Sequence, residues 1–250
     1  MENKVIVIEG PDGAGKTTLV KHLKDEINNL RPSLKVLALS LPHKESFGYD
    51  KIRDILKSKV SYPPDIVQSL FVVNMIDCAD NIIKPFLNES GEDHIVIIDR
   101  SLISTIIYND TSNGTLRESI EKYVYNTRTE EDTNINFDII NKIYCHFPIV
   151  DYTFFLLPPA EILIKHARER HSNEINDQEN LVIERLCAYK ECYNYISGNV
   201  DRVTGGKHFW WWSDENTWDK YLILDRWIFD WSEEENYARY RKKVLDILKI

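Results

Sequence analysis

The chain has 250 residues, of which 43% are hydrophobic, enough for a substantial buried core. Its 31 basic and 40 acidic residues give a formal net charge of −9, which disfavours polymeric nucleic acid as a partner without excluding it. The cysteines Cys78, Cys145, Cys187 and Cys192 form no C-x-x-C pair, so we expect reduced thiols. We recognise no secretory leader, lipidation motif or membrane-spanning run of about 18 apolar residues, and therefore expect a cytoplasmic protein with no membrane partner.

Short apolar runs alternate with helical periodicity along the chain. Five runs have the length of parallel strands that are buried on both faces, at residues 5–9, 35–39, 94–99, 152–157 and 221–225. Helical spacing predicts helices over residues 17–30, 50–60, 65–87, 159–170, 180–196 and 232–250, the last beginning with a Ser232–Glu235 capping box. The alternation predicts a three-layer α/β/α fold around a five-stranded parallel sheet, with ligands beyond the carboxyl ends of the strands.

Two segments interrupt this alternation. Residues 129–136 (TRTEEDTN) are polar and predict a loop between two additional helices. Residues 197–219 form a Trp-rich insertion, and all six tryptophans of the chain lie between Trp210 and Trp231. We expect the tryptophans to supply additional core or an oligomer interface; the alternative is an aromatic surface that stacks the bases of a longer ligand. Residues 1–250 are expected to form one domain that contains this insertion.

The most specific motif lies at residues 10–17 (GPDGAGKT), which match the P-loop pattern G-x-x-x-x-G-K-[ST]. Its glycines allow backbone N–H groups to point at phosphate oxygens, and the following helix adds its positive N-terminal dipole. Lys16 supplies charge for the outer phosphates of ATP, and Thr17 offers a hydroxyl to Mg²⁺. The predicted nucleotide-binding residues are Gly10, Asp12, Gly13, Ala14, Gly15, Lys16, Thr17 and Thr18.

A second motif, Asp99-Arg100-Ser101, ends the third predicted strand. A carboxylate at this edge of the sheet lies beside the P-loop, where it can hold Mg²⁺ or its bound water. We therefore predict Thr17 and Asp99 as the metal-binding residues. Arg100 can bind an acceptor phosphate through two parallel hydrogen bonds.

The segment DRSLISTIIY makes the resemblance to a known family specific. It resembles the D-R-x-x-x-S-x-x-A-Y segment of thymidylate kinases, and IEGPDGAGKTT resembles the P-loop of that family. The resemblance implies a P-loop kinase fold with a lid segment. It also implies that Tyr108 packs against the deoxyribose, where a 2′-hydroxyl would lie, and that Thr105 faces the base. Ser104 shares a helical face with Tyr108.

Further residues of the acceptor site follow from the same resemblance. Residues 69–74 (SLFVVN) are similar to the L-F-x-x-x-R segment of the family, which implies that Phe71 stacks on the base. Met75 stands where the family usually has an arginine for a thymine carbonyl, so the identity of the base stays open. Lys44 lies where the family has an arginine that touches the acceptor phosphate. Asp12 matches an acidic residue near the 3′-hydroxyl, with Glu9 as a possible support.

Residues 165–170 (KHARER) resemble the mobile lid of those thymidylate kinases that lack an arginine inside the P-loop. We expect the lid to span residues 165–179. Arg168 and Arg170 would diverge by about 200° on a continuous helix, so one of them points inward at a time. Arg168 is our predicted lid arginine, and the predicted catalytic residues are Lys16, Asp99, Arg100 and Arg168.

The sequence therefore predicts a thymidylate kinase that transfers the γ-phosphate of ATP to dTMP, gives dTDP, uses Mg²⁺ and, like the family it resembles, forms a homodimer. A first alternative is a kinase of the same fold that acts on a modified pyrimidine such as 5-hydroxymethyluracil, free or within DNA. A second alternative is a nucleotide-binding module without catalytic activity, against which the intact Lys16, Thr17, Asp99 and Arg100 argue.

Overall fold

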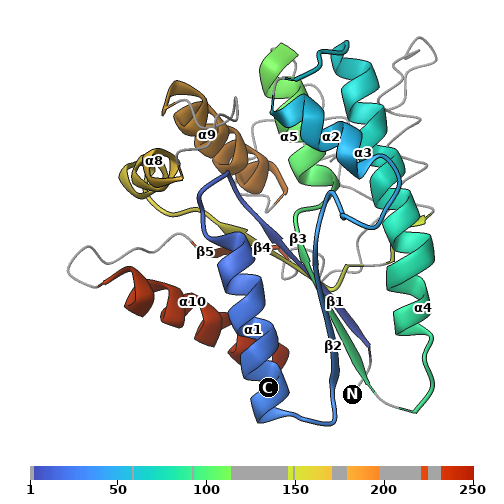
Figure 1. The fold of residues 1–250 in the computed structure, drawn as a ribbon. Coiled ribbons are helices and arrows are strands. Elements are labelled where there is room, and N and C mark those ends of the chain that lie inside the picture. The colour runs from blue at the N-terminus through green and yellow to red at the C-terminus, as the bar shows by residue number, and fades with distance from the viewer. Residues whose placement is uncertain are drawn as a thin grey trace, which may run out of the picture.

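The structure is a computed structural model that describes residues 3–57, 59–91, 93–113, 146–148, 150–170, 179–196, 221–224 and 232–250. Five parallel strands form one sheet in the order β2-β3-β1-β4-β5 (Figure 1). The strands are β1 (Lys4–Glu9), β2 (Lys35–Ser40), β3 (His94–Asp99), β4 (Tyr152–Leu156) and β5 (Tyr221–Leu224). The predicted five-stranded parallel sheet is confirmed. Its strands β1, β3 and β4 are buried over most of their length and carry apolar residues on both faces.

Helices cover both faces of the sheet and complete three layers (Figure 1). Their bounds are α1 (Lys16–Leu30), α2 (Tyr49–Leu56), α3 (Pro64–Cys78), α4 (Lys84–Leu87), α5 (Leu102–Asn113), α8 (Ala160–Glu169), α9 (Glu179–Ile196) and α10 (Glu233–Leu248), with a π-helical turn η1 (Ala79–Ile83) between α3 and α4. The predicted capping box is present at the start of α10. Glu235 N donates to Ser232 Oγ at 3.2 Å, and Ser232 N donates to Glu235 Oε2 at 2.7 Å.

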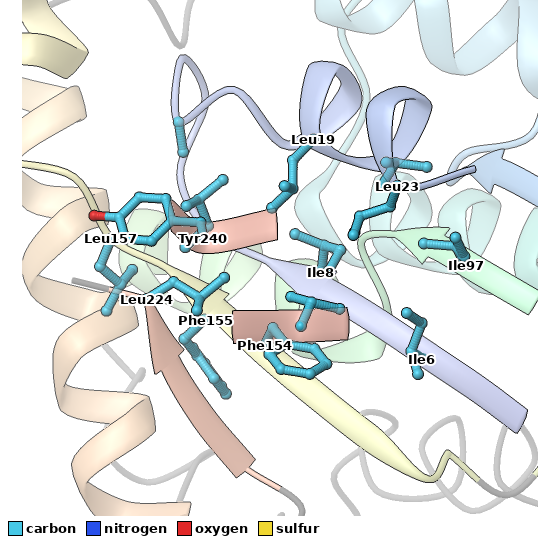
Figure 2. Packing of buried hydrophobic residues seen from close by; sticks show 14 of the residues in the cluster. Ile6, Ile8, Leu19, Leu23, Ile97, Phe154, Phe155, Leu157, Leu224 and Tyr240 are labelled. Atoms are coloured by element: carbon cyan, nitrogen blue, oxygen red, sulfur yellow. The ribbon is translucent and has the colours of Figure 1, made fainter. Parts of the chain in front are cut away.

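Alternate residues of each central strand face opposite layers. Ile6 and Ile8 of β1 pack on one face with Leu19 and Leu23 of α1, and Phe154 of β4 belongs to the same cluster (Figure 2). The intervening residues Val5 and Val7 lie in a second cluster on the other face, with Val72, Met75, Cys78 and Ile83 of the α3–η1 run. Because successive strand residues point to opposite faces, the strands contribute side chains to two separate cores. These cores hold the sheet rigid beneath its loops.

The run Ile66–Leu87, through α3, η1 and α4, is long and apolar enough for a membrane-spanning helix by length and composition, with a mean hydropathy of 1.4. The sequence did not lead us to expect such a run. Its apolar side chains contribute to the second core cluster. Asn74, in its middle, is fully buried and hydrogen-bonded to the loop at residues 43–47. These contacts bury one side of the run in the protein core.

The connection between β1 and α1 places the P-loop beside the end of β3. In the sheet register Ile8 pairs with Asp99, and Ser40 of β2 pairs with Asp99 on the other side. Arg100 N then donates to Ile8 O at 3.0 Å, so the segments that follow β1 and β3 lie side by side where the two strands end. Because β1 lies between β3 and β4, the strand order reverses here, and this is where parallel α/β sheets form ligand crevices.

Candidate active site

A cavity of about 1400 Å³ lies beyond the carboxyl ends of the strands. One small-molecule ligand usually occupies a pocket of about 300–1,000 Å³, so this cavity has room for two nucleotides. Its wall includes the predicted site residues Asp12, Gly13, Gly15, Lys16, Thr17, Thr18, Phe71, Asp99, Arg100, Ser104, Thr105 and Tyr108. Four predicted site residues, Gly10, Ala14, Lys44 and Arg168, do not line it.

The P-loop backbone requires glycine at two of its positions. Gly10 has φ 153°, and a Cβ there would collide with the backbone carbonyl oxygen of Leu156. Gly15 has φ 82°, and a Cβ there would lie 2.7 Å from the hydroxyl of Tyr237. That hydroxyl donates to Ala14 O at 2.8 Å, so α10 supports the loop from behind. Side chains at Gly10 or Gly15 would therefore displace the loop that faces the cavity.

Lys16 is the central cation of the loop and is 5% exposed. Its Nζ donates to Pro11 O at 2.8 Å, which folds the side chain over the loop. Burial and the positive charge of Arg100 lower the pKa of Lys16 to about 8, although Asp99 and Asp12 oppose the shift. A phosphate group in the cavity would give this ammonium a stronger partner than a carbonyl oxygen.

Thr17 and Asp99, the predicted metal-binding residues, are in contact. Thr17 Oγ1 donates to Asp99 Oδ2 at 2.6 Å, and Ser40 Oγ donates to the same oxygen at 3.4 Å. Asp99 is 3% exposed, and its buried Oδ1 has no hydrogen-bond partner among the described residues. Hydroxyl and carboxylate oxygens are ligands that suit Mg²⁺, which typically takes one or two carboxylates plus substrate phosphates and water.

Within the part of the chain that the structure describes, no group of three or more His, Cys, Asp or Glu side chains could hold a metal ion by itself. The donor set at Thr17 and Asp99 therefore fits an ion that is shared with a bound nucleotide rather than one enclosed by the protein.

Arg100 connects the P-loop to α5 and adopts a positive φ of 79°. It forms an ion pair with Asp12, and its Nη1 donates to Gly10 O at 3.3 Å and to Ser104 Oγ at 3.1 Å. The hydroxyl of Tyr108 donates to Asp12 Oδ2 at 2.8 Å. The structure thus brings together four residues that the sequence assigned to the acceptor side: Asp12, Arg100, Ser104 and Tyr108.

The charges of this cluster are set by its partners. Burial tends to raise the pKa of Asp12, but the charges of Arg100 and Lys16 outweigh it and lower that pKa to about 2. The pKa of Arg100 lies well above its usual value despite burial, because of the neighbouring Tyr108 and Asp12. Burial raises the pKa of Tyr108. At neutral pH the cavity therefore presents a carboxylate, a guanidinium and a neutral phenol in contact.

Glu9 and Tyr189 contact this cluster from the protein interior. Glu9 is fully buried; its Oε1 accepts from Ser101 N at 2.7 Å and from Ser101 Oγ at 2.5 Å, and its Oε2 accepts from Ser104 Oγ at 2.6 Å. Arg100 Nη1 donates to the hydroxyl of Tyr189 at 3.2 Å. The sequence suggested Glu9 as a support but did not indicate Tyr189, which stands in α9 without any local motif.

The wall opposite the P-loop is formed by α3 and α5 (Figure 1). Phe71 is partly buried there, Met75 is 2% exposed, and Thr105 Oγ1 donates to Met75 Sδ at 3.8 Å. Gln68 also lines this wall, and no motif in the sequence marks it as a site residue. Lys44 lies apart, with its side chain 72% exposed and 3.7 Å from Glu45.

Helix α8, the first part of the predicted lid, closes over the P-loop. His166 Nδ1 lies 2.7 Å from Gly13 O, and His166 Nε2 lies 2.8 Å from Glu233 Oε2 at the start of α10. Both partners are acceptors, so both contacts are hydrogen bonds only in the doubly protonated imidazolium. Lys165 forms an ion pair with the same carboxylate. Neither His166 nor Glu233 was predicted, because their contact depends on helices far apart in the sequence.

The two lid arginines occupy different environments. Arg170, the C-terminal cap of α8, lines the cavity. The side chain of Arg168 is 69% exposed, and its Nη2 lies 2.5 Å from Glu179 Oε1. Residues 171–178 of the predicted lid, the 129–136 loop and the 197–219 insertion with its tryptophans lie outside the described residues, so those predictions stay as they are.

The parallel sheet, the P-loop and a cavity large enough for two nucleotides define a P-loop kinase of the nucleoside monophosphate class. The sequence model of the thymidylate kinase family matches residues 8–200, and the chain belongs to this family.

Individual relatives agree with this assignment. The chain is 32% identical over 167 residues to the thymidylate kinase of Mycoplasma mobile, covering 65% of this chain and 70% of that protein. It is 26% identical over 206 residues to the probable thymidylate kinase of Caldivirga maquilingensis, covering 75% and 96%. The match to the thymidylate kinase of Brachyspira hyodysenteriae, 30% identical over 127 residues, spans 50% of this chain and 56% of that protein.

A solved structure of thymidylate kinase from Candida albicans has the same fold. It superposes with a TM-score of 0.63 and covers 99% of this chain and 93% of its own, at 18% sequence identity.

Proposed function

We propose that this protein transfers the γ-phosphate of ATP to dTMP and releases dTDP and ADP, with Mg²⁺ as cofactor. The observation that carries the proposal is one cavity with a P-loop on one side, Phe71 and Tyr108 on the other, and the Asp12–Arg100 pair between them. The names of the relatives support dTMP as the acceptor.

On the donor side, the backbone N–H groups of the loop and Lys16 would bind the β- and γ-phosphates. Thr17 and Asp99 would hold Mg²⁺, which when bound neutralises charge on the transferred phosphoryl group and its leaving group. Arg170 lies over the loop, where a cation can stabilise the charge that spreads over the phosphoryl oxygens in the transition state. Arg168, the arginine expected from the sequence, would have to turn inward to do so.

On the acceptor side, Phe71 would stack on the base and Tyr108 would fill the space of a 2′-hydroxyl. Asp12 would accept a hydrogen bond from the 3′-hydroxyl. Arg100 would orient the acceptor phosphate for in-line attack on the γ-phosphate, with Ser104 holding the Arg100 side chain. Lys44 could reach that phosphate only if the loop at residues 43–47, which Asn74 now anchors, moved inward.

The direct test is ADP release by the purified protein with ATP, Mg²⁺ and each deoxynucleoside monophosphate. We expect turnover with dTMP. Turnover of another monophosphate, with dTMP and its 5-substituted relatives inactive, would contradict the thymidylate assignment. ATP binding without acceptor-dependent turnover, with Lys16→Ala changing that binding alone, would instead identify a nucleotide-binding module.

Met75 favours a second candidate function, because an apolar side chain that is 2% exposed stands where the family has an arginine. We propose as the alternative a kinase acting on a modified pyrimidine, free or within DNA. The hydroxyl oxygen of 5-hydroxymethyluracil would attack the γ-phosphorus, losing its proton as ADP leaves, and form a phosphate ester. Phosphate transfer to a 5-hydroxymethyluracil oligonucleotide, and none to dTMP, is the result that this alternative requires.

We also propose that residues 1–250 form one kinase domain, which acts as a homodimer in the cytoplasm. Ile66 and Val73 of α3 are 44% and 43% exposed, and their seven-residue spacing gives one apolar helical face that a second copy could cover. The free thiols of Cys78, Cys187 and Cys192 suit a reducing compartment. Light scattering should give twice the 29.4 kDa mass of the chain; a monomer mass would contradict the dimer.

A further inference from the structure

Gln68 of α3 is a buried amide that faces the acceptor half of the cavity. It lines the cavity and is 4% exposed. Phe71 and Met75 follow it by three and seven residues, so the three side chains share one helical face. That face lies beside α5, which carries Thr105 and Tyr108 (Figure 1).

The described part of the protein does not supply a hydrogen-bond donor to the Gln68 amide. Its Oε1 is buried and has no hydrogen-bond partner among the described residues. Leaving a buried acceptor without a donor is unfavourable, and such groups in native proteins call for a ligand or another partner. Since Gln68 lies on the cavity wall, the missing donor is to be sought in the ligand.

Gln68 is the hydrogen-bonding side chain that α3 offers to the cavity. Four residues of α3 line the cavity, Val67, Gln68, Phe71 and Met75, and among them Gln68 alone carries a strong hydrogen-bonding group. Across the gap the Thr105 hydroxyl donates to Met75 Sδ at 3.8 Å, and its oxygen remains able to accept a hydrogen bond from a base. Any hydrogen bond between α3 and a base stacked on Phe71 therefore has to come from Gln68.

A carboxamide is complementary to a base edge that carries a hydrogen-bond donor beside an acceptor. Oε1 accepts one hydrogen bond while Nε2 donates a second, parallel one. A uracil-type ring, the base of the proposed dTMP acceptor, presents a donor at N3–H between acceptors at O2 and O4, and the N3–H and O4 pair lies on the side away from the sugar. An arginine, which has no acceptor, could bind O4 but would leave N3–H without a partner.

We propose that Gln68 is a specificity-determining residue that reads the N3–H and O4 groups of a uracil-type base in the acceptor nucleotide. The inference rests on the proposed acceptor site, since it needs Phe71 to hold the base against α3. Gln68 acts through binding and takes no part in phosphoryl transfer. It applies equally to thymine and to 5-substituted uracils, because the 5-position lies outside the two hydrogen bonds.

The test is calorimetric binding of dTMP and of its N3-methyl derivative to the wild-type protein and to Gln68→Leu. N3 methylation removes the donor that Oε1 needs. The wild type should bind dTMP at least about tenfold more tightly than the methylated nucleotide, and Gln68→Leu should reduce this ratio to about twofold or less. ATP affinity should be unchanged in the variant, which also reports that it is folded.

Asn28→Leu, the same amide-to-leucine change at an exposed residue near the far end of α1, is the matched control and should keep the wild-type ratio. If Gln68→Leu does not fold, Gln68→Glu retains the shape but places a carboxylate against O4, and should weaken dTMP binding at least about tenfold. A wild-type protein that fails to discriminate, or a Gln68→Leu variant that keeps the wild-type ratio, overturns the role of Gln68.

Turnover separates this inference from the proposed function. If the wild type phosphorylates dTMP and Gln68→Leu binds both nucleotides as the wild type does, the role of Gln68 in base selection is overturned. The proposed kinase activity then still stands. If selectivity for dTMP depends on Gln68 but no phosphate is transferred, the proposed kinase activity is overturned and the role of Gln68 in base selection stands. Absence of both binding and transfer for every uracil-type nucleotide overturns both.

Discussion

Arg170 lies over Gly13 of the P-loop: a Cβ on Gly13 would be 3.2 Å from Arg170 Nη2. Arg168, two residues earlier, is instead exposed and paired with Glu179. We therefore expect Arg170→Ala to lower kcat by about 10²-fold or more, because a transition-state cation is lost. Arg168→Ala is the matched control and should stay within about threefold, as removal of a surface ion pair does. ADP release under saturating substrates measures both; a larger loss in Arg168→Ala would show that α8 rearranges when the lid closes.

The contact between Thr17 and Asp99 predicts an altered metal requirement. Asp99→Asn keeps the shape but removes the charge that would hold Mg²⁺, so we expect kcat to fall about 10²-fold and half-maximal activity to need several-fold more Mg²⁺. Ser40→Ala, which removes only the 3.4 Å hydrogen bond to Asp99, should change both values little. An Mg²⁺ titration of Asp99→Asn that superposes on that of the wild type would contradict this assignment.

The lowered pKa of Lys16 leads us to expect that ATP binding is coupled to proton uptake. Its pKa is lowered to about 8 in the free protein, and the phosphates of ATP should raise it again toward the ordinary 10.5. At pH 9 ATP binding should therefore take up as much as about 0.9 of a proton, and affinity should fall as pH rises above about 8. Calorimetry in two buffers of different ionisation enthalpy measures the uptake, which Lys16→Ala should abolish.

The free energy of unfolding of the ligand-free protein should rise with pH, whereas the affinity for ATP should fall. Between about pH 8 and 10.5 the unfolded chain keeps the Lys16 proton that the folded chain has released. The unfolded state thus binds more protons, so this group makes the fold more stable as pH rises through that window. A wild-type protein with the same pH dependence of unfolding as Lys16→Ala would show that burial does not lower the pKa of Lys16.

The parts of the site that the sequence predicted are those defined by one short segment. The P-loop lies between a buried strand and a helix, and Asp99-Arg100 ends the strand that pairs with β1, so their proximity follows from sheet topology. The residues that were missed come from distant segments. Tyr237 supports Ala14 from 223 residues away, and Glu233 meets His166 across 67 residues. No local pattern encodes such contacts.

The choice between the two lid arginines shows a second limit of sequence. Helical spacing gives the angle between Arg168 and Arg170 but not the direction of either one. That direction depends on where α8 ends and on what it packs against; the helix ends at Glu169, and His166 contacts Gly13. Gln68 was missed for a related reason, because an amide in an apolar helix carries no signal until its burial and missing partner are known.

Glu9 predicts a coupling between stability and the acceptor site. Its carboxylate accepts three hydrogen bonds from Ser101 and Ser104, next to Arg100. Glu9→Gln replaces one acceptor oxygen by a donor nitrogen and should cost about 2 kcal/mol of the free energy of unfolding. The KM for dTMP should rise, since Arg100 loses its fixed position. Denaturant unfolding and steady-state kinetics measure these effects, with Ser101→Ala as the milder control; wild-type stability in Glu9→Gln would contradict them.

Two guanidinium groups contact the ring of Tyr108, which gives a sharp test of sugar selection. Arg100 Cζ lies 5.1 Å and Arg185 Cζ 4.5 Å from the centroid of its ring, so the ring has little freedom to move aside for a 2′-hydroxyl. Tyr108→Ala should open this space. The kcat/KM of ribothymidine monophosphate relative to dTMP should then rise by about tenfold or more.

Tyr108→Phe separates the ring from its hydroxyl. It keeps the ring in contact with the two arginines but removes the 2.8 Å hydrogen bond to Asp12. Because steric exclusion depends on the ring, we expect Tyr108→Phe to retain the preference for dTMP, with a kcat lower by about two- to tenfold through the loosened Asp12. If Tyr108→Phe accepted the ribonucleotide as readily as Tyr108→Ala, the hydroxyl and not the ring would select the sugar. Equal discrimination in both variants and the wild type would place sugar selection elsewhere in the cavity.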